Sequence, residues 1–118
     1  MDEKRQARMA KEIGEAIARR RVEARLTQDE VAEKMGIGSE AISRIERGAV
    51  TPSVARLFDF AECFGCRIDE FLLAASDREV DQAQAFGAML KGLSPRDRET
   101  VIEVAEKLSG RFRKPTSK

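Results

Sequence analysis

The chain contains no histidine, tryptophan or tyrosine, and these absences narrow the functions open to it. Without histidine, no imidazole can serve as a general base or activate a nucleophile. The sequence also has no glycine-rich phosphate loop and no acidic pair in a setting typical of acid–base catalysis. We therefore expect neither an enzyme nor a bound cofactor.

Cysteine is scarce as well, because the only two, Cys63 and Cys66, form a single C-x-x-C string. Two thiolates make half of a tetrahedral zinc site, and no histidine is available to complete it. The string lies at an expected helix end around Gly65, whereas thioredoxin-like redox motifs need a strand–helix setting. We predict small buried apolar residues and no metal, with a zinc ion shared across a dimer as the alternative.

Long apolar runs are missing too. No stretch approaches the roughly 18 apolar residues of a membrane span, and the N-terminus lacks a signal-peptide core. We therefore expect a cytoplasmic protein with no membrane partner. With 22 basic and 21 acidic side chains the net charge is only +1, so any nucleic-acid binding must depend on where the basic groups face.

Residues 26–48 carry the most informative pattern, two short helices joined by a tight turn. Thr27 and Glu30 are spaced as a capping box, and Gly36 stands where a left-handed helix end is needed. A second helix is expected from Gly38 or Ser39 to about residue 47. Its outward face would carry Ser39, Glu40, Ser43, Arg44 and Arg47. This is the shape of a helix-turn-helix, whose second helix lies in the major groove of DNA.

Residues 13–73 resemble the Cro and phage-repressor type (XRE-like) helix-turn-helix family over about half of the chain. The resemblance implies an all-α protein whose compact five-helix domain binds operator DNA, usually as a dimer on a palindrome. The residues that carry it are Ile13-Gly14, Ile17, Arg21, Leu26-Thr27-Gln28, Val31-Ala32, Gly36-Ile37, Ile42-Ser43-Arg44-Ile45-Glu46-Arg47-Gly48, Pro52-Ser53, Leu57, Ala61, Gly65 and Ile68-Asp69-Glu70-Phe71-Leu72.

The resemblance also assigns roles position by position. Arg21 and Glu46 match a pair that forms an internal salt bridge between the first and third helices. The positions implied to read or flank the bases are Ser39, Glu40, Ser43 and Arg44. The positions implied to hold the DNA backbone are Thr27, Gln28, Gly38 and Arg47.

The chemistry of the outward face supports these roles unevenly. Arg44 can make the bidentate contact to guanine, which discriminates by about 1–3 kcal/mol against a wrong base. Glu40 cannot donate a hydrogen bond, so it would either accept from a cytosine amino group or tether Arg44 four residues on. Gly38 has no side chain for a helix cap, a role that we expect Ser39 to take over.

The chain divides by pattern into three segments. Residues 1–12 form a basic helical extension that is either a solvated helix face or a DNA arm, and residues 13–74 form the DNA-binding domain. Residues 75–118 predict a two-helix extension, opened by a capping box at Ser76 and by Ser94-Pro95, stopped at Gly110 and followed by a frayed basic tail. This extension would pack against the first domain or a second copy, and we favour a second copy.

The functional hypothesis is a transcriptional regulator, most simply a repressor, that binds a palindromic operator in double-stranded DNA as a homodimer. Such a protein would associate with the nucleoid while bound. Two alternatives remain open: an antitoxin that masks a toxin through residues 75–118, and an adaptor whose helix-turn-helix binds protein rather than DNA.

Overall fold

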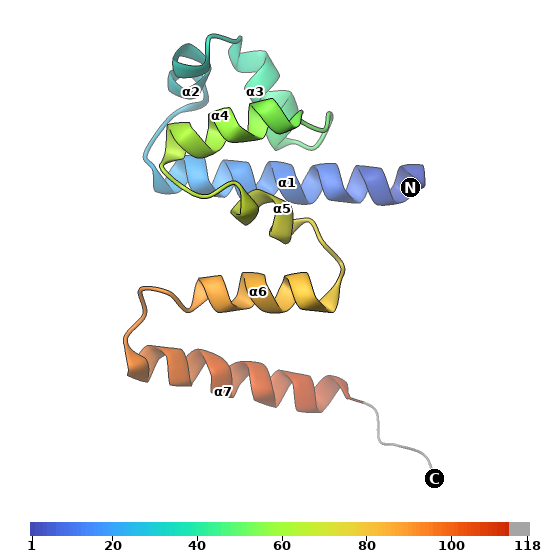
Figure 1. Cartoon of the computed structure of the whole chain (residues 1–118), viewed down its shortest axis with the longest axis vertical. Coiled ribbons are helices and arrows are strands. Elements are labelled where there is room, and N and C mark those ends of the chain that lie inside the picture. The colour runs from blue at the N-terminus through green and yellow to red at the C-terminus, as the bar shows by residue number, and fades with distance from the viewer. Residues whose placement is uncertain (114–118) are drawn as a thin grey trace. The chain divides into compact units, whose positions relative to one another are not determined.

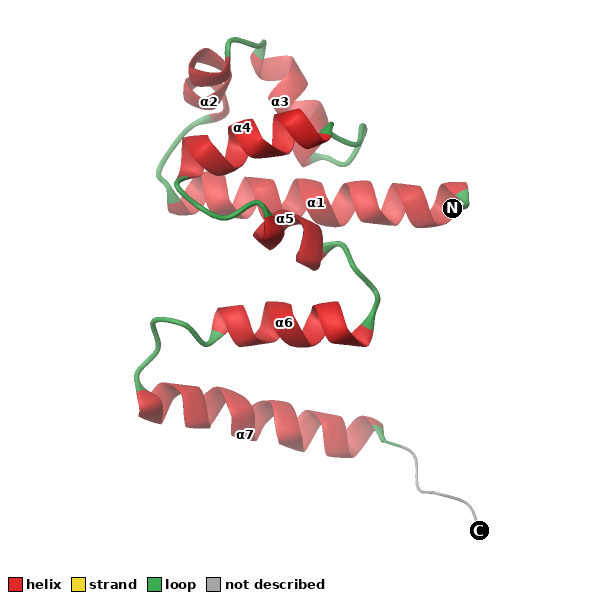
Figure 2. Ribbon diagram, in the orientation of Figure 1, coloured by secondary structure: helices red, strands yellow, loops and turns green. Residues whose placement is uncertain are grey.

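The computed structural model describes residues 1–113, which form α-helices and no strands, as the all-α prediction requires (Figures 1 and 2). None of these helices combines the length and apolar character needed to cross a membrane. The helices are α1 (Glu3–Glu23), α2 (Gln28–Met35), α3 (Ser39–Glu46), α4 (Val54–Phe64), α5 (Asp69–Ala74), α6 (Glu79–Met89) and α7 (Pro95–Phe112).

The first of two compact units spans Met1–Ala85 and contains the five helices predicted for the DNA-binding domain. Helix α1 packs against α3, α4 and α5, while α2 packs against α3 and α4. Burial of apolar surface provides the main driving force for this arrangement. The largest fully buried side chains come from all five helices: Ile17, Val31, Ile42, Phe60 and Phe71.

Two glycines bring the end of α3 directly against the backbone of α1. A Cβ atom at Gly14 would collide with the Ile45 carbonyl oxygen and lie 2.7 Å from that of Glu46. Gly48, which has a φ of +76°, is packed just as closely, because a Cβ atom there would lie 2.7 Å from the Cα of Lys11. The direction of α3 is therefore fixed by backbone contact as well as by side-chain packing.

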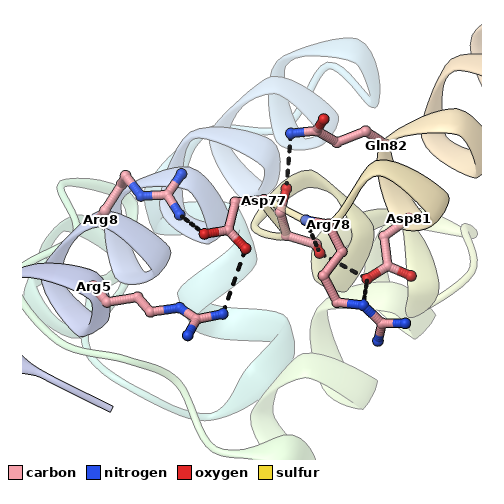
Figure 3. A network of polar contacts seen from close by, with 7 residues as sticks. Arg5, Arg8, Asp77, Arg78, Asp81 and Gln82 are labelled. Atoms are coloured by element: carbon pink, nitrogen blue, oxygen red, sulfur yellow. Dashed lines mark hydrogen bonds and ion pairs between the residues drawn. The ribbon is translucent and has the colours of Figure 1, made fainter.

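The N-terminal extension is helical, as predicted, and is a continuous part of α1, which begins at Glu3. The side chain of Asp2 caps the helix by accepting a hydrogen bond of 2.7 Å from the Arg5 backbone N–H. Arg5 and Arg8 also form ion pairs of 3.4 and 3.1 Å with Asp77, which precedes α6 (Figure 3). All three side chains are about half exposed, so these pairs contribute little to stability.

Three details outside the helix-turn-helix differ from expectation. Ser76 does not form the predicted capping box, because its Oγ donates to Asp81 at 2.7 Å and accepts from the Arg78 N–H. Gly110 does not stop α7, which continues to Phe112, and this glycine does not adopt the left-handed conformation that ends α2 and α4. Leu72, whose apolar side chain next to Phe71 would favour burial, is 47% exposed. The tail expected to fray lies mostly outside the described residues.

The last helix begins as predicted. Ser94 accepts a hydrogen bond of 3.1 Å from the Asp97 N–H, and Pro95 occupies the first helical position. Neither α6 nor α7 contains a buried residue, and α7 exposes the apolar side chains Val101, Ile102, Val104, Leu108 and Phe112.

We expect Gly14→Ala to lower the free energy of unfolding by roughly 1–3 kcal/mol, because the added methyl group must push α3 away from α1. Gly87→Ala in α6 is the matched control: no atom lies within 4 Å of the position that its Cβ would take, and alanine is the better helix former. Urea unfolding of both variants tests this, and equal stability of the two would contradict the close approach.

Candidate nucleic-acid interface

Short-range hydrogen bonds define both ends of α2, including the turn that leads to α3. Thr27 Oγ1 accepts from the Glu30 N–H at 3.1 Å, and Glu30 Oε1 accepts from the Thr27 N–H at 2.9 Å. The latter bond is the main cause of the lowered pKa of Glu30. Gly36, with a φ of +68°, ends α2, and the Ile37 N–H then donates to the Ala32 carbonyl at 3.0 Å. The predicted capping box and left-handed turn are both present.

The first residue of α3 differs in role from the sequence prediction. Gly38 is the N-cap residue and provides no side-chain hydrogen bond, while Ser39 is already helical. The expectation that Ser39 would take over the cap is therefore wrong, because the cap needs an extended backbone that Gly38 adopts.

Helix α3 has one buried face and one open face. Ile42 and Ile45 are buried in the core of the first unit. Along the other side, Ser39, Glu40, Arg44 and Arg47 are exposed and Ser43 is half exposed. The helix-turn-helix thus presents a polar surface of the five predicted residues on an element whose opposite side is firmly packed.

Glu40 pairs with Arg47, not with Arg44 as the tether hypothesis expected. Its Oε1 lies 3.5 Å from Arg47 Nη2, and both side chains are more than 60% exposed. Arginine is long enough to reach across two helical turns, and such an exposed pair is weak enough to exchange for a phosphate contact. No ion pair or side-chain hydrogen bond engages Arg44 within residues 1–113, so its guanidinium is available to a base.

A half-buried polar network joins the ends of α1, α2 and α3. Arg21 binds both carboxylate oxygens of Glu46, with Nε–Oε2 and Nη2–Oε1 distances of 2.7 and 3.1 Å. Arg21 also donates to the Leu26 carbonyl at 2.8 Å, just before α2. Glu46 is only 6% exposed and Arg21 16%, so each needs the other for its charge to be tolerated.

Gln28 belongs to the same network. Its side-chain amide donates a hydrogen bond of 3.0 Å from Nε2 to Glu46 Oε1. A primary amide has two N–H bonds, so the second remains for an acceptor outside the protein. Gln28 is therefore oriented by the last residue of α3, and any phosphate that it holds is placed relative to that helix.

The two cysteines lie against the core but are less completely buried than the sequence interpretation expected. Cys63 and Cys66 are unpaired, half buried and packed against the core. Burial raises the pKa of both thiols, which disfavours the reactive thiolate. Across the described part of the chain, no group of three or more potential metal ligands comes together.

Sequence reasoning overlooked Arg56 of α4. It lines a groove of about 270 Å³ together with residues of α3 and of the loop before α4, namely Ala41, Arg44, Ile45, Val50, Thr51, Pro52 and Ser53. Its position in the sequence, three residues after the Ser53 cap, could have indicated a functional role. A cation in the first turn of a helix is opposed by the helix dipole, so an arginine there suggests a purpose outside the helix.

Comparison with known sequences agrees with this geometry. The family described as "Helix-turn-helix" matches residues 17–71, which contain α2, the turn and α3. An uncharacterized HTH-type transcriptional regulator of Methanocaldococcus jannaschii is 35% identical over 52 residues, which is 44% of this chain and 79% of that protein.

Two bacterial proteins are similarly related. An uncharacterized HTH-type transcriptional regulator of Sinorhizobium fredii is 39% identical over 57 residues, covering 48% of this chain and 74% of its own length. An uncharacterized transcriptional regulator in the ATPase CF(0) region of Rhodospirillum rubrum is 31% identical over 88 residues, covering 71% of this chain and 82% of its own.

We expect Glu46→Ala to lower the free energy of unfolding by about 3 kcal/mol, because it leaves the half-buried Arg21 without a counter-charge. Glu23→Ala is the control: its pair with Arg20, 3.0 Å long, is solvent exposed, and its loss should cost less than about 1 kcal/mol. Chemical denaturation measures both, and a Glu46 variant no less stable than the control would contradict a structural role for the network.

Proposed function

The chain belongs to the Cro and phage-repressor type helix-turn-helix family of DNA-binding transcriptional regulators, and on this premise we propose that it is a repressor that binds a palindromic operator as a homodimer. The observation that carries the proposal is the open polar face of α3, held on a packed scaffold. A helix fixed in this way can enter the major groove with a constant register.

The base-reading role falls to the outward residues of α3. Arg44 has no competing ion pair in the described chain and can bind the O6 and N7 atoms of guanine together. Ser39 and Ser43 can donate to or accept from base edges, while Glu40 can accept from a cytosine amino group once its weak pair with Arg47 opens.

Contacts to the DNA backbone fix the register in which those residues meet the base pairs. The free N–H of the Gln28 amide and the amino end of α2 beyond Thr27 suit one phosphate. Arg47 and the uncapped start of α3 at Gly38 suit others. These contacts position the protein without choosing a sequence.

The second copy is proposed on the basis of α7. Val101, Ala105, Leu108 and Phe112 follow the three- and four-residue spacing of a coiled-coil stripe, and three of them are between 36% and 78% exposed. Pairing of α7 would bring two reading helices onto one palindrome, and occupancy of a promoter by that dimer would repress it.

Selection of bound duplexes from a random DNA pool tests sequence recognition. We expect a symmetric site and expect Arg44→Lys to relax base choice at one position in each half, because lysine cannot make the bidentate guanine contact. Gln28→Ala should weaken binding to all sequences about equally. Enrichment of no motif by the wild-type protein would reject the operator proposal.

Sedimentation equilibrium tests the dimer. Leu108→Asp should shift the protein towards monomer, because a carboxylate would be desolvated inside the paired stripe. Lys107→Asp, on the neighbouring polar side of α7, should leave the association unchanged. A monomeric wild-type protein would contradict pairing by α7. A stoichiometric complex with a different small protein would favour the antitoxin alternative.

A further inference from the structure

We propose that Arg56 and the groove between α3 and α4 form a phosphate-binding site for the DNA strand beside the base pairs that α3 reads. This inference rests on the proposed function and extends it to a residue on α4, outside the helix-turn-helix. The groove of about 270 Å³ opens between Arg44 on one element and Arg56 on the next. It therefore places a second guanidinium beside the one that is available for base reading.

The composition of the groove favours an anion. Its other lining residues are uncharged, so no carboxylate stands between the two arginines. Within residues 1–113, Arg56 has no ion pair, not even with Asp59 one helical turn further along α4, and its side chain makes no hydrogen bond. Two like charges that share a groove are best stabilised by a ligand of opposite charge.

The local structure holds Arg56 in place without occupying its side chain. The Arg56 backbone N–H donates to Ser53 Oγ at 3.1 Å, which fixes the first turn of α4. Leu57 and Phe60, the next inward residues of the same helix, are 3% and 0% exposed. Arg56 itself is half buried, and its guanidinium consequently extends from a rigid base.

The chemistry of the two arginines divides their roles. Arg44 projects from the outward face of α3, where base edges would lie, and specificity comes from such contacts. Arg56 projects from α4, outside the reading helix, where the sugar–phosphate backbone would border the groove. A guanidinium binds the two non-bridging oxygens of a phosphodiester through parallel hydrogen bonds.

The full-length protein and its selected operator duplex provide the test, with dissociation constants measured by fluorescence anisotropy over a range of salt concentrations. Loss of one phosphate contact lowers the slope of log K against log salt by about 0.9 for each protomer. We expect that loss for Arg56→Ala, with the base preference unchanged. Arg56→Lys should keep most of the slope, because an ammonium still pairs with a phosphate.

Arg96→Ala is the matched control, since it removes the same charge from the exposed start of α7. A slope for Arg56→Ala that equals the slope for Arg96→Ala would overturn the site, as would a changed base preference in Arg56→Ala. Failure of the wild-type protein to prefer its selected operator over random DNA would instead reject the proposed function. The slope comparison on random duplexes then still decides whether Arg56 binds phosphate.

Discussion

The carboxylate of Glu46 is the interaction on which the rest of the interface depends. It closes the last turn of α3 and receives hydrogen bonds from Arg21 on α1 and Gln28 on α2. One nearly buried group thus sets the angle between the two helices of the motif and their distance from the scaffold. Because a buried charge without its partner is costly, this arrangement is held more strictly than apolar packing alone would require.

The glycine contacts add a steric constraint to this electrostatic one. Gly14 lets the final carbonyls of α3 touch the backbone of α1, so the helix cannot move closer or slide without a collision. A reading helix needs such rigidity, because an error of a fraction of an ångström misaligns bidentate hydrogen bonds. The same rigidity fixes the backbone positions from which the side chains of the open face extend.

Near-neutral net charge is compatible with DNA binding because the acidic groups near the reading face are engaged. Glu46 is held by Arg21, and Glu40 lies beside Arg47. Arg44 and Arg56 are left facing a groove without a carboxylate in its lining. Local arrangement rather than total charge therefore decides the electrostatic character of this surface.

The sequence alone determined what depends on neighbours in the chain: the Thr27 capping box, the turn at Gly36 and the alternation of buried and open positions along α3. Its resemblance to a family added the Arg21–Glu46 pair. Where several hydrogen-bond partners compete, as at Ser76, the sequence pattern predicted a capping box, whereas the side chain instead binds Asp81. Only the tertiary structure brought Arg56 beside Arg44, since they lie on different helices and no periodicity relates residues across a loop.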